Sequence, residues 1–236
     1  MALSDTRRVS RIGLGACMVA APLLFTAGDI LDRSVNSDND AKYVAQIAAH
    51  HKAHWLAGFF MLLGAIALLG AVLGLAHLVR TRKPALANVA GPLAAAGTMA
   101  MVGWAVITMG VDPALGRSPN RAAMVALYHD ASNSSDLAPN IVLMFVFLLA
   151  VIALAVGLYR ARVVPRVLAV LLGLSMIALF VGSDGAGQWI ASALFIAGMG
   201  GIGLTVLGRS DEEWETGAMP EMQPPVAPEA PAAVSA

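Results

Sequence analysis

Long runs of hydrophobic residues alternate with polar segments along this chain. The runs cover residues 12–27, 55–79, 86–111, 140–159, 167–181 and 189–207. A helix rising 1.5 Å per residue needs about 20 apolar residues to cross a hydrocarbon layer of ~30 Å. The pattern therefore predicts an all-α membrane protein in which residues 1–208 form a bundle of six transmembrane helices.

The polar segments between the runs carry their own signals. Asp38 or Asp40 is predicted to cap a helix that continues directly into the second run. Ser118-Pro119 is predicted to begin a short helix at the membrane interface. The Gly70-xxx-Gly74 spacing in the second run predicts a seam where another helix backbone approaches closely.

The two ends of the chain differ in composition. Residues 26–28 (Thr-Ala-Gly) have the small side chains of a signal-peptide cleavage site, so cleavage remains open beside our preferred interpretation of an uncleaved first span. From residue 209 the chain is rich in Glu, Pro and Ala and has no apolar periodicity. Residues 209–236 are therefore predicted to form a disordered cytoplasmic tail.

The composition agrees with a membrane protein and excludes several other classes. Of the 236 residues, 58% are hydrophobic and 13% are charged, whereas soluble domains carry about 25% charged residues. The 15 basic and 15 acidic residues balance, so nothing favours binding to nucleic acid. A single cysteine, Cys17, excludes an intrachain disulfide and a cysteine-based metal cluster.

The basic residues predict the orientation of the bundle. Segments 1–11, 80–84 and 160–166 hold nine of the 15 Lys and Arg residues, and all three fall on one side of a six-span topology. Because basic loops stay in the cytoplasm, both termini are predicted to be cytoplasmic. Most histidines and the loop aspartates then lie on the outer side.

The outer histidines are the strongest candidates for a site. His50 and His54 stand one helical turn apart, and with His129 and Asp130 they make up a candidate set of ligands for a transition metal or haem. Asp29 and Asp32 are alternative carboxylate ligands. The competing interpretation is that these are ordinary polar residues at a water boundary. The chain has no HExxH motif and no glutamate before the tail, which disfavours a zinc peptidase.

Three stretches resemble a known family. They are AKYVAQIAAHHKAHWLAGFFMLLGAIALLGAVLGLAHLVRTRK, the Ala/Gly-rich span after it, and LYRARVVPRVLAVLLGLSMIALFVG at residues 158–182. Together they resemble six-span bacterial membrane proteins grouped under a domain of unknown function, over roughly residues 10–207. The resemblance implies six spans and a bacterial inner (cytoplasmic) membrane, and it implies no activity.

These observations favour a non-enzymatic membrane protein that binds a lipid or a small apolar ligand, or that serves as an accessory subunit. Its expected partners are the lipid bilayer and other membrane proteins. The alternative is an outer-face metal- or haem-binding protein with a redox or hydrolytic role. A transporter is less favoured, because the middle of each span lacks ionisable residues.

Overall fold

The computed structural model describes residues 3–33, 35, 39–181 and 186–216, and it is helical throughout its regular elements. The helices in chain order are α1 (Leu3–Asp32), α2 (Asp40–Arg80), α3 (Pro84–Val106), the π-helix η1 (Ile107–Val111), α4 (Asp112–Arg117), α5 (Arg121–Ser132), the 3₁₀ turn η2 (Ser135–Leu137), α6 (Ala138–Ala161), α7 (Arg166–Val181), α8 (Ala186–Phe195), the π-helix η3 (Ile196–Gly200), α9 (Gly201–Leu207) and α10 (Asp211–Thr216).

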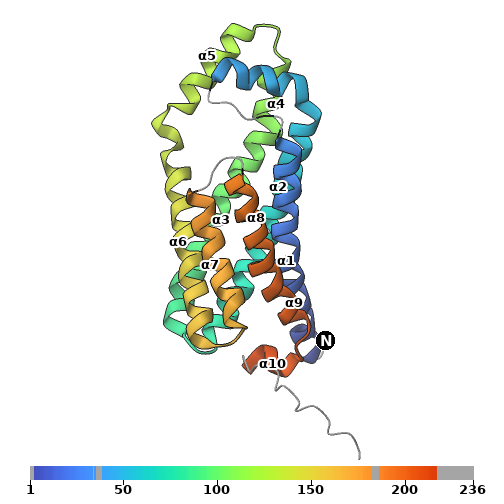
Figure 1. Cartoon of the computed structure of the whole chain (residues 1–236), viewed down its shortest axis with the longest axis vertical. Coiled ribbons are helices and arrows are strands. Elements are labelled where there is room, and N and C mark those ends of the chain that lie inside the picture. Colours follow the sequence, from blue (N-terminus) through green and yellow to red (C-terminus); the bar gives the residue numbers. More distant parts are fainter. Residues whose placement is uncertain (1–2, 34, 36–38, 182–185, 217–236) are drawn as a thin grey trace, which may run out of the picture.

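Within the described residues, five helical segments are long and apolar enough to cross a membrane, which indicates a multi-pass membrane protein. They are Thr6–Asp32, Asp40–Arg80, Pro84–Arg117, Ala138–Ala161 and Ala186–Leu207. The sixth predicted span corresponds to α7, a shorter apolar helix of 16 residues. It packs between α6 and α8. All six segments run lengthwise in the bundle (Figure 1).

Several predicted helix boundaries differ from those observed. Asn39, and not Asp40, caps α2, and its side chain accepts a hydrogen bond from the Lys42 N–H at 3.0 Å; Asp38 lies outside the described residues. The short helix α5 begins after Asn120, whose side chain accepts a hydrogen bond from the Ala123 N–H, and not at Ser118-Pro119. An amide side chain offers the same acceptor as Asp or Ser at this position.

The first part of the predicted disordered tail is helical in the structure. Asp211–Thr216 form α10, which starts with a reciprocal capping pair. The Ser210 N–H donates to the Glu213 carboxylate at 2.7 Å, and the Glu213 N–H donates to Ser210 Oγ at 3.2 Å. This is the Ser-x-x-Glu capping box, which satisfies two otherwise free N–H groups. Residues 217–236 lie outside the described part of the chain.

The predicted close approach at Gly70 and Gly74 is confirmed. A Cβ atom on Gly70 would lie 2.7 Å from Cys17 Sγ, so the absence of a side chain lets α1 pack directly on α2. Around this seam the core is built from aliphatic side chains of α1, α2, α6, α7 and α9, such as Met18, Leu75 and Leu154.

The two ends of the bundle are built differently. Figure 1 shows the first turns of α2 with α4 and α5 at one end, and α10 with the start of α1 at the other. We call them the cap end and the α10 end. Both described ends of the chain meet at the α10 end, where Arg7 pairs with Glu215 and Arg11 pairs with Asp211.

Candidate functional site

A buried polar network centred on His54 lies at the cap end. Only 1% of His54 is exposed. Its Nδ1 lies 2.5 Å from Asp32 Oδ1 at the end of α1, and its Nε2 lies 3.1 Å from Asp112 Oδ2 at the start of α4. The Tyr43 hydroxyl donates to the same Asp112 oxygen at 3.3 Å. One imidazole therefore joins α1, α2 and α4.

Two interruptions of regular helix bring these residues together. The backbone of His50 is non-helical (φ −118°, ψ 23°), so α2 bends one turn before His54. The π-helix η1 precedes Asp112 and shifts its register on the helix that continues α3. Gly58 allows η1 to approach, since a Cβ atom there would lie 2.8 Å from the backbone nitrogen of Met109.

The outer turns of α2 and helix α5 cover this network. The rings of Tyr43 and Tyr128 stack with their centroids 4.7 Å apart. Burial, with the nearby carboxylates of Asp112 and Asp40, raises the pKa of the Tyr128 phenol, so it stays protonated at neutral pH. At the exposed edge, His129 Nδ1 lies 2.7 Å from Asp40 Oδ2 and ties α5 to the start of α2.

The predicted metal ligands are separated into different environments. His54 is buried, whereas His50, His129 and Asp130 are exposed. Among the described residues, no group of three or more His, Cys, Asp or Glu side chains is arranged to hold a metal ion. Each ring nitrogen of His54 faces a carboxylate oxygen, so neither is available as a ligand in this arrangement. The metal or haem site stays a prediction.

The His54 network is suited to fixing helices rather than to proton transfer with a substrate. With both carboxylates ionised, hydrogen bonds at both ring nitrogens require a doubly protonated imidazole, and Asp112 also accepts from Tyr43. Such charge-assisted bonds are about twice as strong as neutral ones, so they hold α1, α2 and α4 in one relative position.

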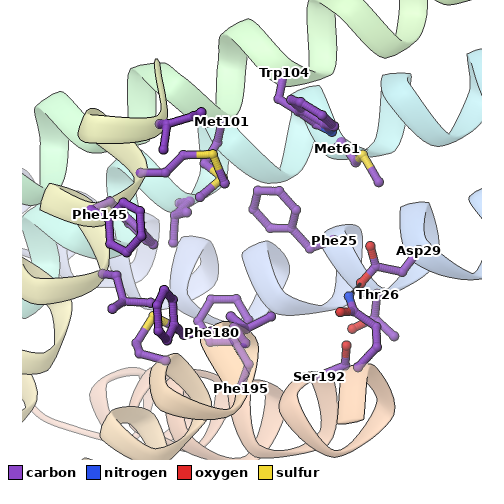
Figure 2. A pocket seen from close by; sticks show the side chains of 18 residues that line it. Phe25, Thr26, Asp29, Met61, Met101, Trp104, Phe145, Phe180, Ser192 and Phe195 are labelled. Atoms are coloured by element: carbon purple, nitrogen blue, oxygen red, sulfur yellow. Dashed lines mark hydrogen bonds between the residues drawn. The ribbon is translucent and has the colours of Figure 1, made fainter. Parts of the chain in front are cut away.

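A cavity of about 520 Å³ opens between α1, α2, α3, α6, α7 and α8. It lies deeper in the bundle than the His54 network. Met61, on its wall, follows His54 by two turns of α2. Most of the wall is aromatic, aliphatic or methionine, as Figure 2 shows. This volume lies within the range of about 300–1,000 Å³ that is typical of small-molecule sites.

The polar groups of the cavity gather at one end. Of the 18 lining residues, four are polar: Thr26, Asp29, Gln188 and Ser192. Figure 2 shows Thr26, Asp29 and Ser192 together, away from Phe145 and Phe180. Gln188 Nε2 donates to Asp29 Oδ2 at 2.9 Å. The cavity therefore has a long apolar part and a small polar end.

Sequence reasoning missed this cavity and the roles of two carboxylates. Asp29 was predicted only as an alternative metal ligand, and Asp112 was visible only as an aspartate next to an apolar run. A single carboxylate at the end of an apolar span indicates a contact with a polar partner, because an ionisable group near hydrocarbon needs one. Its partners, His54 for Asp112 and Gln188 for Asp29, lie 58 and 159 residues away, beyond the reach of any local pattern.

Comparison with known proteins supplies the family and no activity. The sequence model of the family described as "Domain of unknown function (DUF4386)" matches residues 14–208. No curated protein and no solved structure matches the chain. The match covers most of the helical bundle, so the chain belongs to this family, and the expected resemblance to a domain-of-unknown-function family is confirmed.

Proposed function

Starting from a family with no assigned activity, we propose that this protein binds a lipid or another small, mostly apolar molecule in the cavity between its helices. The observation that supports the proposal is the cavity itself, which combines about 520 Å³ of space, an apolar wall and a polar group at one end. Enclosed apolar space with a few convergent polar groups is the usual form of a binding site.

The surface around the cavity fits an occupant that arrives from the bilayer. Phe180, on the cavity wall, is also 59% exposed. Trp104 and Ile141 line the cavity and are exposed as well. A molecule dissolved in the hydrocarbon layer would meet these side chains without crossing water. This favours ligand binding over a purely structural role as an accessory subunit.

The proposal places the bundle in a bacterial inner membrane with six crossings and both termini in the cytoplasm. Helix α7 supplies the remaining crossing, since it packs against α6 on one side and α8 on the other. Basic residues such as Arg82, Lys83 and Arg160 lie at the α10 end of the spans, as the positive-inside rule expects of a cytoplasmic face. The cavity's polar end then faces the outer leaflet.

A pair of adjacent leucines on α6 provides the test. Leu148 lines the cavity, whereas Leu149 is 63% exposed on the lipid side. The substitution L148W fills the cavity, and L149W adds the same ring outside it. Lipids and apolar molecules retained by the protein in an uncharged detergent are counted by native mass spectrometry. We expect L148W to lose the bound molecule and L149W to keep it.

Two outcomes would contradict the proposal. One is a wild-type protein that retains no molecule after purification and binds none of an added panel of single-chain lipids. The other is equal retention by L148W and L149W, which would place the binding site elsewhere. Thermal unfolding of both variants shows whether the packing of α6 has been preserved.

A further inference from the structure

The polar end of the cavity contains the carboxylate of Asp29, for which the described residues supply no cationic partner. Asp29 accepts a hydrogen bond from Gln188. Among the described residues, the ion pairs formed by Lys, Arg and His do not include Asp29. The neighbouring carboxylate Asp32 is occupied by His54. Asp29 therefore lines the cavity without an ion pair to a cationic side chain of the described residues.

The cation nearest to Asp29 along the chain, Arg33, contacts an aromatic ring instead. Arg33 lies one turn beyond Asp29 on the chain, but its guanidinium sits over the ring of Trp189, 5.7 Å from the centroid. Ionisable groups near the hydrocarbon layer are costly, and they usually mark a site where a partner or a substrate supplies the opposite charge. The missing partner of Asp29 points to a ligand.

The rest of the cavity end suits an organic cation. Phe25 and Trp104 contribute aromatic rings to the cavity wall, together with Met61 (Figure 2). Aromatic faces attract ammonium groups, and the attraction reaches about 2 kcal/mol when the site is dry. A carboxylate beside aromatic rings satisfies both the charge and the surface of an alkylammonium head.

We propose that the cavity selects amphipathic molecules with a cationic ammonium head, bound at Asp29, and an apolar body that lies along the wall of α6 and α7. This inference rests on the proposed ligand-binding function and names the class of ligand. An anionic head is disfavoured by Asp29 and by the nearby Asp32. A neutral alcohol head satisfies the hydrogen bonds but leaves the carboxylate charge unpaired.

The test compares three probes with one chain length and different heads. Purified protein in an uncharged detergent is mixed with dodecyltrimethylammonium, dodecanol or dodecanoate, and bound molecules are counted by native mass spectrometry. We expect the ammonium probe to bind about tenfold or more tightly than the alcohol, and the carboxylate probe to bind weakest. The tenfold preference corresponds to about 1.4 kcal/mol.

Matched variants locate the preference. D29N removes the charge while keeping an oxygen that accepts from Gln188, so we expect the ammonium and alcohol probes to bind about equally. D130N removes an exposed outer carboxylate away from the cavity, and it should keep the wild-type preference. L148W should bind none of the three probes. Melting temperatures of the variants show that D29N is folded.

The outcomes separate the two proposals. Equal binding of ammonium and alcohol by the wild type, or an unchanged preference in D29N, would overturn the ammonium inference and leave ligand binding standing. Binding of none of the probes by the wild type would overturn both. A further arm offers lysophosphatidylethanolamine. Binding comparable to the ammonium probe assigns the site to an amine lipid headgroup, and weaker binding assigns it to a free long-chain amine.

Discussion

The cap end and the α10 end of this bundle hold their helices together by different means. At the cap end, a buried imidazole bridges two carboxylates from separate helices. At the α10 end, Trp214 is buried and stacks on His77, with ring centroids 4.5 Å apart. The Arg7–Glu215 and Arg11–Asp211 ion pairs lie beside it, the first exposed and the second partly buried. One end depends on a buried ionic network between helices, and the other depends mainly on packing of a short docked helix.

The difference separates a candidate functional region from a structural one. Buried charges cost free energy unless each has a partner, and replacing them with apolar groups is often neutral or stabilising. Their presence at the cap end, two turns from a cavity that contains Asp29, therefore needs an explanation besides stability. At the α10 end, a buried aromatic ring and a few ion pairs are ordinary stabilising contacts, and the buried guanidinium of Arg209 donates to a backbone carbonyl.

Arg209 shows how tightly the α10 end is closed. Its side chain is buried, and its guanidinium donates to the Val163 carbonyl in the turn between α6 and α7. Burial lowers the pKa of this guanidinium from its ordinary value, although Glu213 opposes the change. The contact joins the end of α9 to the α6–α7 turn, which closes the bundle beside α10.

The largest expected effect comes from breaking the buried charge network. D112A leaves His54 without its second carboxylate and Tyr43 without its acceptor. Removing one partner of a buried pair costs about 3–5 kcal/mol. We expect a marked fall in the melting temperature in detergent and weaker binding in the adjoining cavity. D130A, at an exposed site, should stay within about 0.5 kcal/mol of wild type. Equal melting curves would show that the network contributes no stability.

A smaller effect is expected at the α10 end. W214A removes a ring that is 2% exposed. A buried Trp→Ala change costs about 3–5 kcal/mol in a domain core. Here we expect about 1–3 kcal/mol, because α10 is short and can detach while the bundle stays folded. Hydrogen exchange should rise in residues 211–216 and remain unchanged in α2.

The W214A variant also tests whether the two ends of the bundle are independent. Binding in the cavity should match wild type, since Trp214 belongs to α10, which lies at the other end of the bundle from the cap end (Figure 1). W55A removes an exposed indole from α2 and serves as the matched control, with little change in hydrogen exchange at α10. Loss of cavity binding in W214A would mean that the two ends are coupled, contrary to the separation described above.

The smallest effect is expected from the outermost ion pair. The Arg7 and Glu215 side chains are 48% and 39% exposed and approach within 2.7 Å. E215Q removes this charge pair, and exposed pairs contribute about 0.2–1 kcal/mol. The difference from wild type in thermal unfolding should shrink at high salt, because screening weakens the pair in the wild type. A salt-independent loss would indicate that Glu215 acts through packing.

The sequence by itself determined the helices and their apolar character. Hydropathy depends on each segment alone, so the apolar runs and the Gly70–Gly74 seam were predictable and are confirmed. The Ser210-x-x-Glu213 capping box was also present in the sequence and could have predicted α10. The six-span topology with cytoplasmic termini stays a prediction.

Only the tertiary structure decided which polar groups meet. His54 and His50 stand on the same helix, yet His54 pairs with Asp32 and Asp112 from other helices, whereas His50 forms the bend. The physical reason is that helices apolar on every side carry no periodic signal of which face turns inward. The rotation of each helix about its axis, the bend in α2 and the π-helix before Asp112 determine which faces turn inward. They thereby determine the polar network and the cavity.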